Sequence, residues 1–142
     1  MDGQTNLLLA RTNFEAMTAH DLDRYGATMD EDHVWESDTL PAVMRGRVAA
    51  QQAMAGYYQA FPDIRFDIVR DFATDDYAVV CWRALGTQQG ELMGIPPTGR
   101  AIDIQGCSIF EVRDGQITHA WTYWDTGKML QQLGVLPPAG AG

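Results

Sequence analysis

The stretch from Gly90 to Gly134 reads GELMGIPPTGRAIDIQGCSIFEVRDGQITHAWTYWDTGKMLQQLG. Its segment Gly94 to Gly99 holds two prolines between glycines, which excludes a helix interior or a central strand because proline has no N–H donor. Residues 101–112 are rich in β-branched and apolar side chains and predict a strand, and Asp114-Gly115 predicts a hairpin turn. Gln116 to Trp124 predicts the returning strand. A short helix is then expected to end the stretch.

Helices are predicted mainly before this stretch. Apolar residues recur at helical spacing in three segments, which predicts helices over residues 4–17, 22–28 and 48–61. A first strand is expected over Val34 to Asp38. From Ile64 onward the apolar period changes to two, which predicts further strands, with a long one over Tyr77 to Thr87. Helices segregated from strands indicate an α+β fold. We expect one domain over residues 1–142, with residues 136–142 as a loose tail.

The composition excludes several partners. Ten basic residues against 19 acidic residues give a formal net charge of −9, and nucleic-acid binding rests on basic patches, so no nucleic-acid partner is expected. Apolar runs are too short for a membrane span or a signal segment, so we expect a cytoplasmic protein without membrane contact. Cys81 and Cys107 are interpreted as small buried thiols, with a disulfide or a nucleophile as alternatives.

The histidines do not have the spacing of metal ligands, so no metal is expected. His20 and His33 are interpreted as a loop residue and a strand-edge residue. His119 is in phase with Trp121 and Tyr123 on the last strand. It could therefore face a pocket or, as the alternative, the surface or a dimer interface.

The motifs GELMGIPPTGR, DGQI, W-x-Y-W-D and LQQLG together resemble the SnoaL-like polyketide cyclase (ester cyclase) family of the NTF2-like superfamily. The resemblance is close over Gly90 to Gly134 and extends to the rest of the chain as a pattern of elements. It implies a cone in which three N-terminal helices pack on a curved antiparallel sheet, with a short C-terminal helix and a deep apolar pocket. It does not by itself imply a reaction.

The resemblance also nominates a catalytic residue. The family's proposed general acid/base is the Asp between the aromatic strand and the final helix, which corresponds to Asp125 here. A dry aromatic setting raises the pKa of a carboxyl, which suits acid/base work. From the residues alone, the N-cap of the final helix is the favoured interpretation of Asp125, and the resemblance reverses that order. Gln88 replaces a histidine in the family's G-T-H-x-G-E pattern, and Ser108 lies about where some cyclases use a second histidine.

A pocket for a small apolar or polycyclic molecule is predicted from the aromatic side chains, which include Phe14, Trp35, Tyr57, Trp82, Trp121 and Tyr123. Core packing and a dimer interface are the alternative for some of these rings. Trp121 and Trp124 have opposite strand parity, so both face the same side only if a bulge intervenes.

Two other reactions known for this superfamily find less support. A ketosteroid-isomerase-like enzyme would place its proton-shuttling Asp near Asp38 and would want a tyrosine on the first helix, where Phe14 stands. Asp38 reads alternatively as a turn residue. An epoxide-hydrolase-like relay needs a second carboxylate near Arg83, which its strand does not provide.

The first hypothesis, taken from the resemblance together with the position of Asp125, is an enzyme without a cofactor that uses Asp125 as general acid/base on an apolar carbonyl compound, in an aldol-type polyketide cyclisation. Alternatives are a non-catalytic binder of small apolar ligands with the same fold, or an isomerase-like or epoxide-hydrolase-like enzyme that uses Asp38 or Asp125. A homodimer is also expected from the family, with the convex sheet face as interface.

Overall fold

The computed structural model describes residues 2–38 and 42–137, so residues 138–142 of the predicted tail lie outside it. The helices are α1 (Gly3–Thr18), α2 (Leu22–Ala27), α3 (Arg47–Ala60) and α4 (Thr126–Gln132). The strands are β1 (Met29–Glu36), β2 (Met44–Arg45), β3 (Arg65–Ala73), β4 (Tyr77–Thr87), β5 (Ala101–Arg113) and β6 (Gln116–Trp124). The predicted bounds of β4 and β6 are confirmed, and so is the α+β class.

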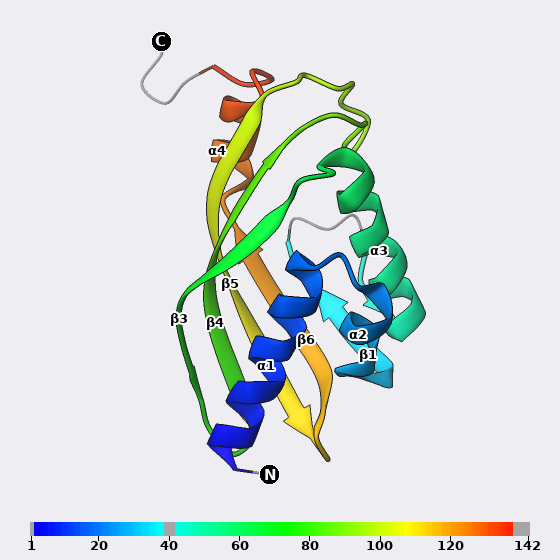
Figure 1. The fold of residues 1–142 in the computed structure, drawn as a ribbon, viewed down its shortest axis with the longest axis vertical. Coiled ribbons are helices and arrows are strands. Elements are labelled where there is room, and N and C mark those ends of the chain that lie inside the picture. Colours follow the sequence, from blue (N-terminus) through cyan, green and yellow to red (C-terminus); the bar gives the residue numbers. More distant parts are fainter. Residues whose placement is uncertain (1, 39–41, 138–142) are drawn as a thin grey trace.

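The six strands form one curved sheet in the order β2-β1-β6-β5-β4-β3 (Figure 1). Strands β3 to β6 are a continuous antiparallel meander, as predicted. Strand β1, however, runs parallel to β6, so the expectation of an antiparallel sheet is corrected to a mixed sheet. A parallel pair of strands needs a long connection between them. Here the elements from β2 to β5 form that connection between β1 and β6.

Strand β1 begins earlier than predicted, at Met29 rather than Val34. Its first residues include the charged run Asp30 to Asp32, which lies outside the predicted strand. Pairing with β6 holds the strand on both sides of this run, since Met29 pairs with Ile117 and Val34 with His119, with a shift of register between them.

The first three helices lie on one side of the curved sheet, and α4 follows β6 at its end (Figure 1). Helix α1 contacts β3 and β4, whereas α3 contacts β1. Asp21 is the N-cap of α2, since its side chain accepts a hydrogen bond from the backbone N–H of Arg24. No helix within residues 2–38 and 42–137 is long and apolar enough to cross a membrane.

Strand alternation separates a buried face from an outer face. On β4 the residues Ala78, Val80, Trp82 and Ala84 point inward and are almost fully buried. Cys81 lies on the outer face, directly across from Cys107 on β5, and both thiols are free and half-buried. Burial raises the pKa of the Cys107 thiol, with Cys81 adding to the rise.

Gly106 leaves room for the indole of Trp82. The two residues are cross-strand partners, and a Cβ built on Gly106 would overlap the Trp82 ring. Because Trp82 is 5% exposed and packed in the core, its ring has little space to move.

We predict that Gly106→Ala lowers the free energy of unfolding by about 1–3 kcal/mol, because overpacking displaces a buried ring. Gly56→Ala is the matched control. Gly56 lies within α3 with nothing near its Cβ position, so alanine should raise stability by roughly 0.5–1 kcal/mol. Chemical denaturation measures both changes. A Gly106→Ala protein as stable as the wild type would contradict this packing.

Candidate functional site

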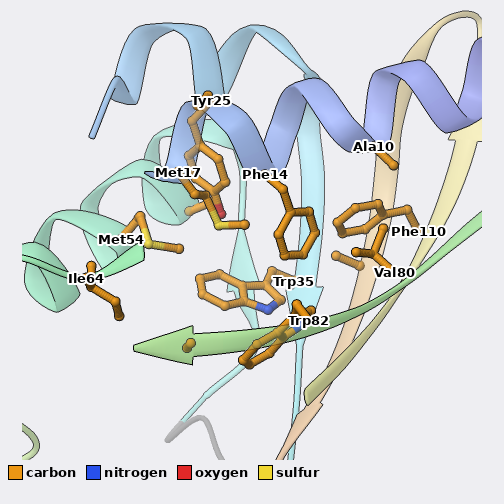
Figure 2. Close-up of a cluster of buried hydrophobic side chains, with 14 of the residues drawn as sticks. Ala10, Phe14, Met17, Tyr25, Trp35, Met54, Ile64, Val80, Trp82 and Phe110 are labelled. Carbon is orange, nitrogen blue, oxygen red and sulfur yellow. The ribbon is translucent and has the colours of Figure 1, made fainter. Parts of the chain in front are cut away.

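An apolar cavity of about 80 Å³ lies between the inner face of the sheet and helices α1 to α3. Figure 2 shows Phe14 and Met17 of α1 and Tyr25 of α2 turned toward Trp35 and Trp82 of the sheet. Met54 of α3 and Ile64 close one side of the same cluster. The predicted apolar stripe of the first helix is what places Phe14 and Met17 on this wall.

Aromatic rings form most of one wall. The ring centroid of Phe14 lies 6.1 Å from that of Phe110 and 6.3 Å from that of Phe66. Phe66 in turn meets Trp82 edge to face at 5.8 Å. Such tilted and edge-to-face contacts are the favoured geometry for aromatic pairs, so the wall is packed rather than loosely filled.

Two indoles donate hydrogen bonds to two hydroxyls at the cavity surface. Trp35 Nε1 lies 3.0 Å from Thr122 Oγ1, and Trp82 Nε1 lies 3.0 Å from Ser108 Oγ. The two hydroxyl oxygens are 3.5 Å apart, because Ser108 and Thr122 are cross-strand partners on β5 and β6. All four side chains are buried and line the cavity.

His33 also lines the cavity and is 1% exposed, so its interpretation as a strand-edge residue is corrected. Its Nδ1 lies 3.0 Å from the carbonyl oxygen of Ile117. A carbonyl can only accept, so Nδ1 carries the proton and Nε2 keeps a lone pair while the ring is neutral. Burial lowers the pKa of His33, although the bond to Ile117 opposes the shift, so the ring is neutral at pH 7.

The cavity wall carries no carboxylate, lysine or arginine among the residues that the structure describes. Besides His33, its ionisable groups are the phenols of Tyr25 and Tyr57. Burial raises the pKa of Tyr57 to about 12 and that of Tyr25 further, so both stay protonated at neutral pH. No group of three or more His, Cys, Asp or Glu in residues 2–38 and 42–137 could hold a metal ion.

Five of the predicted pocket residues line this cavity, namely Phe14, Trp35, Tyr57, Trp82 and Ser108. They come from helices α1 and α3 and from strands β1, β4 and β5. The same wall includes three residues that were not predicted from the sequence to line a pocket, namely Tyr25, His33 and Thr122. A signal for Thr122 exists, because it has the strand parity of Trp124.

His119, Trp121 and Tyr123 were expected in the pocket but do not line it. Their neighbours Ala120 and Thr122 point inward, so strand alternation sends this set to the outer face. There His119 Nε2 lies 2.6 Å from Glu36 Oε2, and its ring stacks on Trp121 at 3.9 Å. The alternative of a surface or interface histidine fits this placement.

Gln88 and Asp38 also lie outside the cavity wall. Gln88 is fully buried under the Pro-Pro loop, where its amide nitrogen donates to the carbonyls of Gly90, Ile95 and Pro96. Its amide oxygen accepts from the backbone N–H and the hydroxyl of Thr98. Gln88 therefore holds the loop together rather than facing a ligand. Asp38 is an exposed turn residue.

Asp125 is not part of the cavity wall, although it lies between two residues of that wall in the chain. Trp124 before it and Met129 after it both line the cavity, whereas Asp125 itself is exposed. Its Oδ1 accepts a hydrogen bond from the backbone N–H of Lys128 at 2.9 Å, which confirms its interpretation as the N-cap of α4. The carboxylate is thus not enclosed by the aromatic cluster, and its catalytic role stays a prediction.

The model of the family described as SnoaL-like polyketide cyclase matches residues 7–133. A protein of Jannaschia sp. CCS1 described as a SnoaL-like polyketide cyclase shares 21% identity and a TM-score of 0.86, over 96% of this chain and 95% of its own. IdmH of Streptomyces antibioticus, described as a polyketide cyclase, shares 28% identity and a TM-score of 0.77, over 89% and 96%. No curated protein matches the sequence.

The fold is not tied to one reaction. AclR of Streptomyces galilaeus, described as a hydroxylase, shares 24% identity and a TM-score of 0.81, over 93% of this chain and 82% of its own. Because proteins with different described activities share this fold, the likeness establishes the fold and leaves the chemistry to be argued from the site.

We predict that the imidazole of His33 titrates below its ordinary pKa of about 6.5 in the folded protein. The unfolded chain then takes up this proton first, so the contribution of His33 to stability is complete above about pH 6.5 and falls as the pH drops through the folded pKa. Ring signals of His33 followed by NMR between pH 8 and pH 5 measure the titration. A midpoint at or above about 6.5 would show that burial does not control this ring.

Proposed function

Since the chain belongs to the SnoaL-like polyketide cyclase family, we propose that it is a cofactor-independent enzyme of the cyclase or isomerase type that moves a proton on a small apolar carbonyl compound. The observation that supports this best is the cavity itself. Its wall is mostly apolar and free of charged side chains among the described residues, and its polar groups include two hydroxyls, two phenols, the amide of Asn13, indole N–H groups and a neutral histidine. Such a wall suits a neutral ligand that carries oxygen.

The chemistry proposed is an aldol-type cyclisation. A base removes a proton from the carbon next to a carbonyl, and the resulting enolate attacks a second carbonyl of the same molecule. One C–C bond forms, and the new alkoxide takes a proton back from the conjugate acid of the base. Because the carbonyl groups already acidify the C–H bond, the reaction needs no cofactor.

Asp125 is the base that the family resemblance proposes. Its position supports the role in one respect: the neighbours Trp124 and Met129 line the cavity, so the carboxylate is close in the chain to the cavity wall. Its bond to the backbone of Lys128 engages only Oδ1, which leaves Oδ2 without a hydrogen bond within the described chain. Capping and proton transfer can therefore coexist.

The cavity volume favours a small substrate. Ligand pockets commonly measure about 300–1,000 Å³, whereas this cavity measures about 80 Å³. The flexible side chains of Met17, Met54 and Met129 line it and can rearrange around a larger molecule. A compact carbonyl compound therefore fits the site more readily than a polycyclic one.

A non-catalytic binding function is the second candidate, and the exposure of Asp125 favours it. In that case the same cavity would hold an apolar ligand without changing it. Ligands would raise the melting temperature by mass action and be recovered unaltered.

We predict that the protein exchanges the α-protons of cyclohexanone in D₂O, and that Asp125→Asn slows this exchange by about 10²-fold or more, because general-base catalysis contributes about 10²–10⁴. Asparagine is as good an N-cap as aspartate, so this variant removes the charge and keeps the helix start. Proton NMR follows the exchange. Exchange within a few-fold of the wild type would exclude Asp125 as base. Ligand-induced stabilisation without exchange would favour the binding function.

We also propose a homodimer through the outer face of the sheet. Phe72, Val79, Ile109 and Trp121 form a continuous cross-strand row there, each paired with the next in register. Phe72 is 56% exposed and the nearby Tyr123 is 49% exposed. An apolar row of this kind on a sheet face is typical of a protein–protein interface.

For this interface we predict a dimer in sedimentation velocity at micromolar concentration, converted to a monomer by Ile109→Lys, because a charge buried in an apolar interface is costly. Leu8→Lys is the matched control, since Leu8 is 63% exposed on α1, away from the outer face. This control should remain a dimer. A monomeric wild type would refute the proposal.

A further inference from the structure

The hydroxyls of Ser108 and Thr122 lie side by side in the cavity with an indole bonded to each. Ser108 is 4% exposed and Thr122 is 7% exposed. Apolar side chains surround the pair on its own strands, with Phe110 beside Ser108, and Ala120 and Trp124 beside Thr122 on the inner face. Polar groups buried in such surroundings must be hydrogen-bonded or they cost free energy.

The hydrogen bonds of this cluster leave at least one donor without an acceptor among the described residues. An indole N–H only donates, so Trp35 and Trp82 each occupy one lone pair of a hydroxyl oxygen and supply no acceptor. Two hydroxyl protons remain. The contact between Ser108 Oγ and Thr122 Oγ1 can use one of them, and at 3.5 Å it is a long bond. At least one hydroxyl proton therefore has no acceptor within the described part of the protein.

We infer that Ser108 and Thr122 form a hydrogen-bond donor site for a carbonyl oxygen of the ligand. The inference deepens the proposed function and rests on it, in that the ligand is a carbonyl compound. A carbonyl oxygen accepts the spare proton and removes the cost of an unpaired donor, whereas a hydrocarbon of the same shape does not. The two indoles strengthen the donor, because a hydroxyl that accepts a hydrogen bond donates a stronger one.

The site also selects between oxygen compounds. It offers neutral donors and no cation, since the cavity wall carries no lysine or arginine among the described residues. One or two hydroxyls do not compensate the desolvation of a full carboxylate. Ketones, aldehydes and esters are therefore preferred over carboxylates, and an enolate forming from a bound ketone would be stabilised at the same oxygen.

The experiment compares cyclohexanone with methylenecyclohexane, in which a CH₂ group replaces the carbonyl oxygen. Dissociation constants come from NMR titrations that follow the indole N–H signals of Trp35 and Trp82. Thr122→Val and Ser108→Ala each remove one hydroxyl. Thr118→Val is the matched control on the same strand, because its hydroxyl bonds to Glu111 and does not line the cavity.

We expect the wild type and Thr118→Val to share one ratio of ketone to hydrocarbon affinity. In Thr122→Val and Ser108→Ala this ratio should fall by about 3–10-fold, the usual worth of one hydrogen bond. Thr122→Ser should restore it. If the variants do not fold, the ¹³C carbonyl shift of labelled cyclohexanone bound to the wild type decides, because it moves downfield only when the oxygen accepts a hydrogen bond.

The outcomes separate this inference from the proposed function. Ketone preference that depends on the hydroxyls, without proton exchange, would support the donor site and refute the enzyme. Proton exchange with unchanged affinity ratios in the variants would overturn the donor site and leave the enzyme. A bound carbonyl with the shift it has in a hydrocarbon solvent, or no binding of either compound to the wild type, would also overturn the inference.

Discussion

Two hydrogen bonds from indole N–H groups to hydroxyls organise the interior of this protein. Trp35 bonds across to β6 and Trp82 to β5, so the rings are fixed in orientation as well as buried. The bonds are necessary because an indole N–H without an acceptor in an apolar cavity costs free energy. Gly106 provides the space under Trp82 that this orientation requires. The shape of the cavity therefore depends on these four hydrogen-bonded side chains in a mostly apolar wall.

In the proposed function, binding and proton transfer fall to different groups. The cavity wall has no charged side chain among the described residues, which favours a neutral ligand, and the hydroxyls of Ser108 and Thr122 are the proposed oxygen-binding position. Asp125, the carboxylate that the family resemblance proposes as the base, is exposed outside the cavity wall and caps α4. His33 lines the cavity as well, and its neutral ring keeps a lone pair on Nε2 while burial lowers its pKa.

Local patterns allowed much of the fold to be predicted. The period of two over Tyr77 to Thr87 and Gln116 to Trp124 marked β4 and β6 with their bounds, because one face of each strand is buried. The parallel pairing of β1 could not be predicted, since it depends on a strand more than 80 residues away. For the same reason Met29 to Asp32, a charged segment on its own, was not recognised as strand.

The site residues were predicted less well than the fold, mainly because the sequence does not tell which face of a strand points inward. Trp121 and Trp124 cannot share a face of β6, and the sequence does not say which of them points inward. The structure turns Trp124 and Thr122 inward, so His119 and Tyr123 lie outside. Gln88 occupies a motif position of the family, but its buried amide forms hydrogen bonds with the Pro-Pro loop. His33 had no local signal, because its burial follows from the pairing of β1 with β6.

A crystal structure of the protein soaked with cyclohexanone would test most directly whether this cavity is the functional site. We predict the ring between the aromatic wall and β6, with its oxygen within hydrogen-bond distance of Ser108 Oγ or Thr122 Oγ1. A ring bound elsewhere on the molecule, or bound in the cavity with its oxygen away from both hydroxyls, would contradict the assignment.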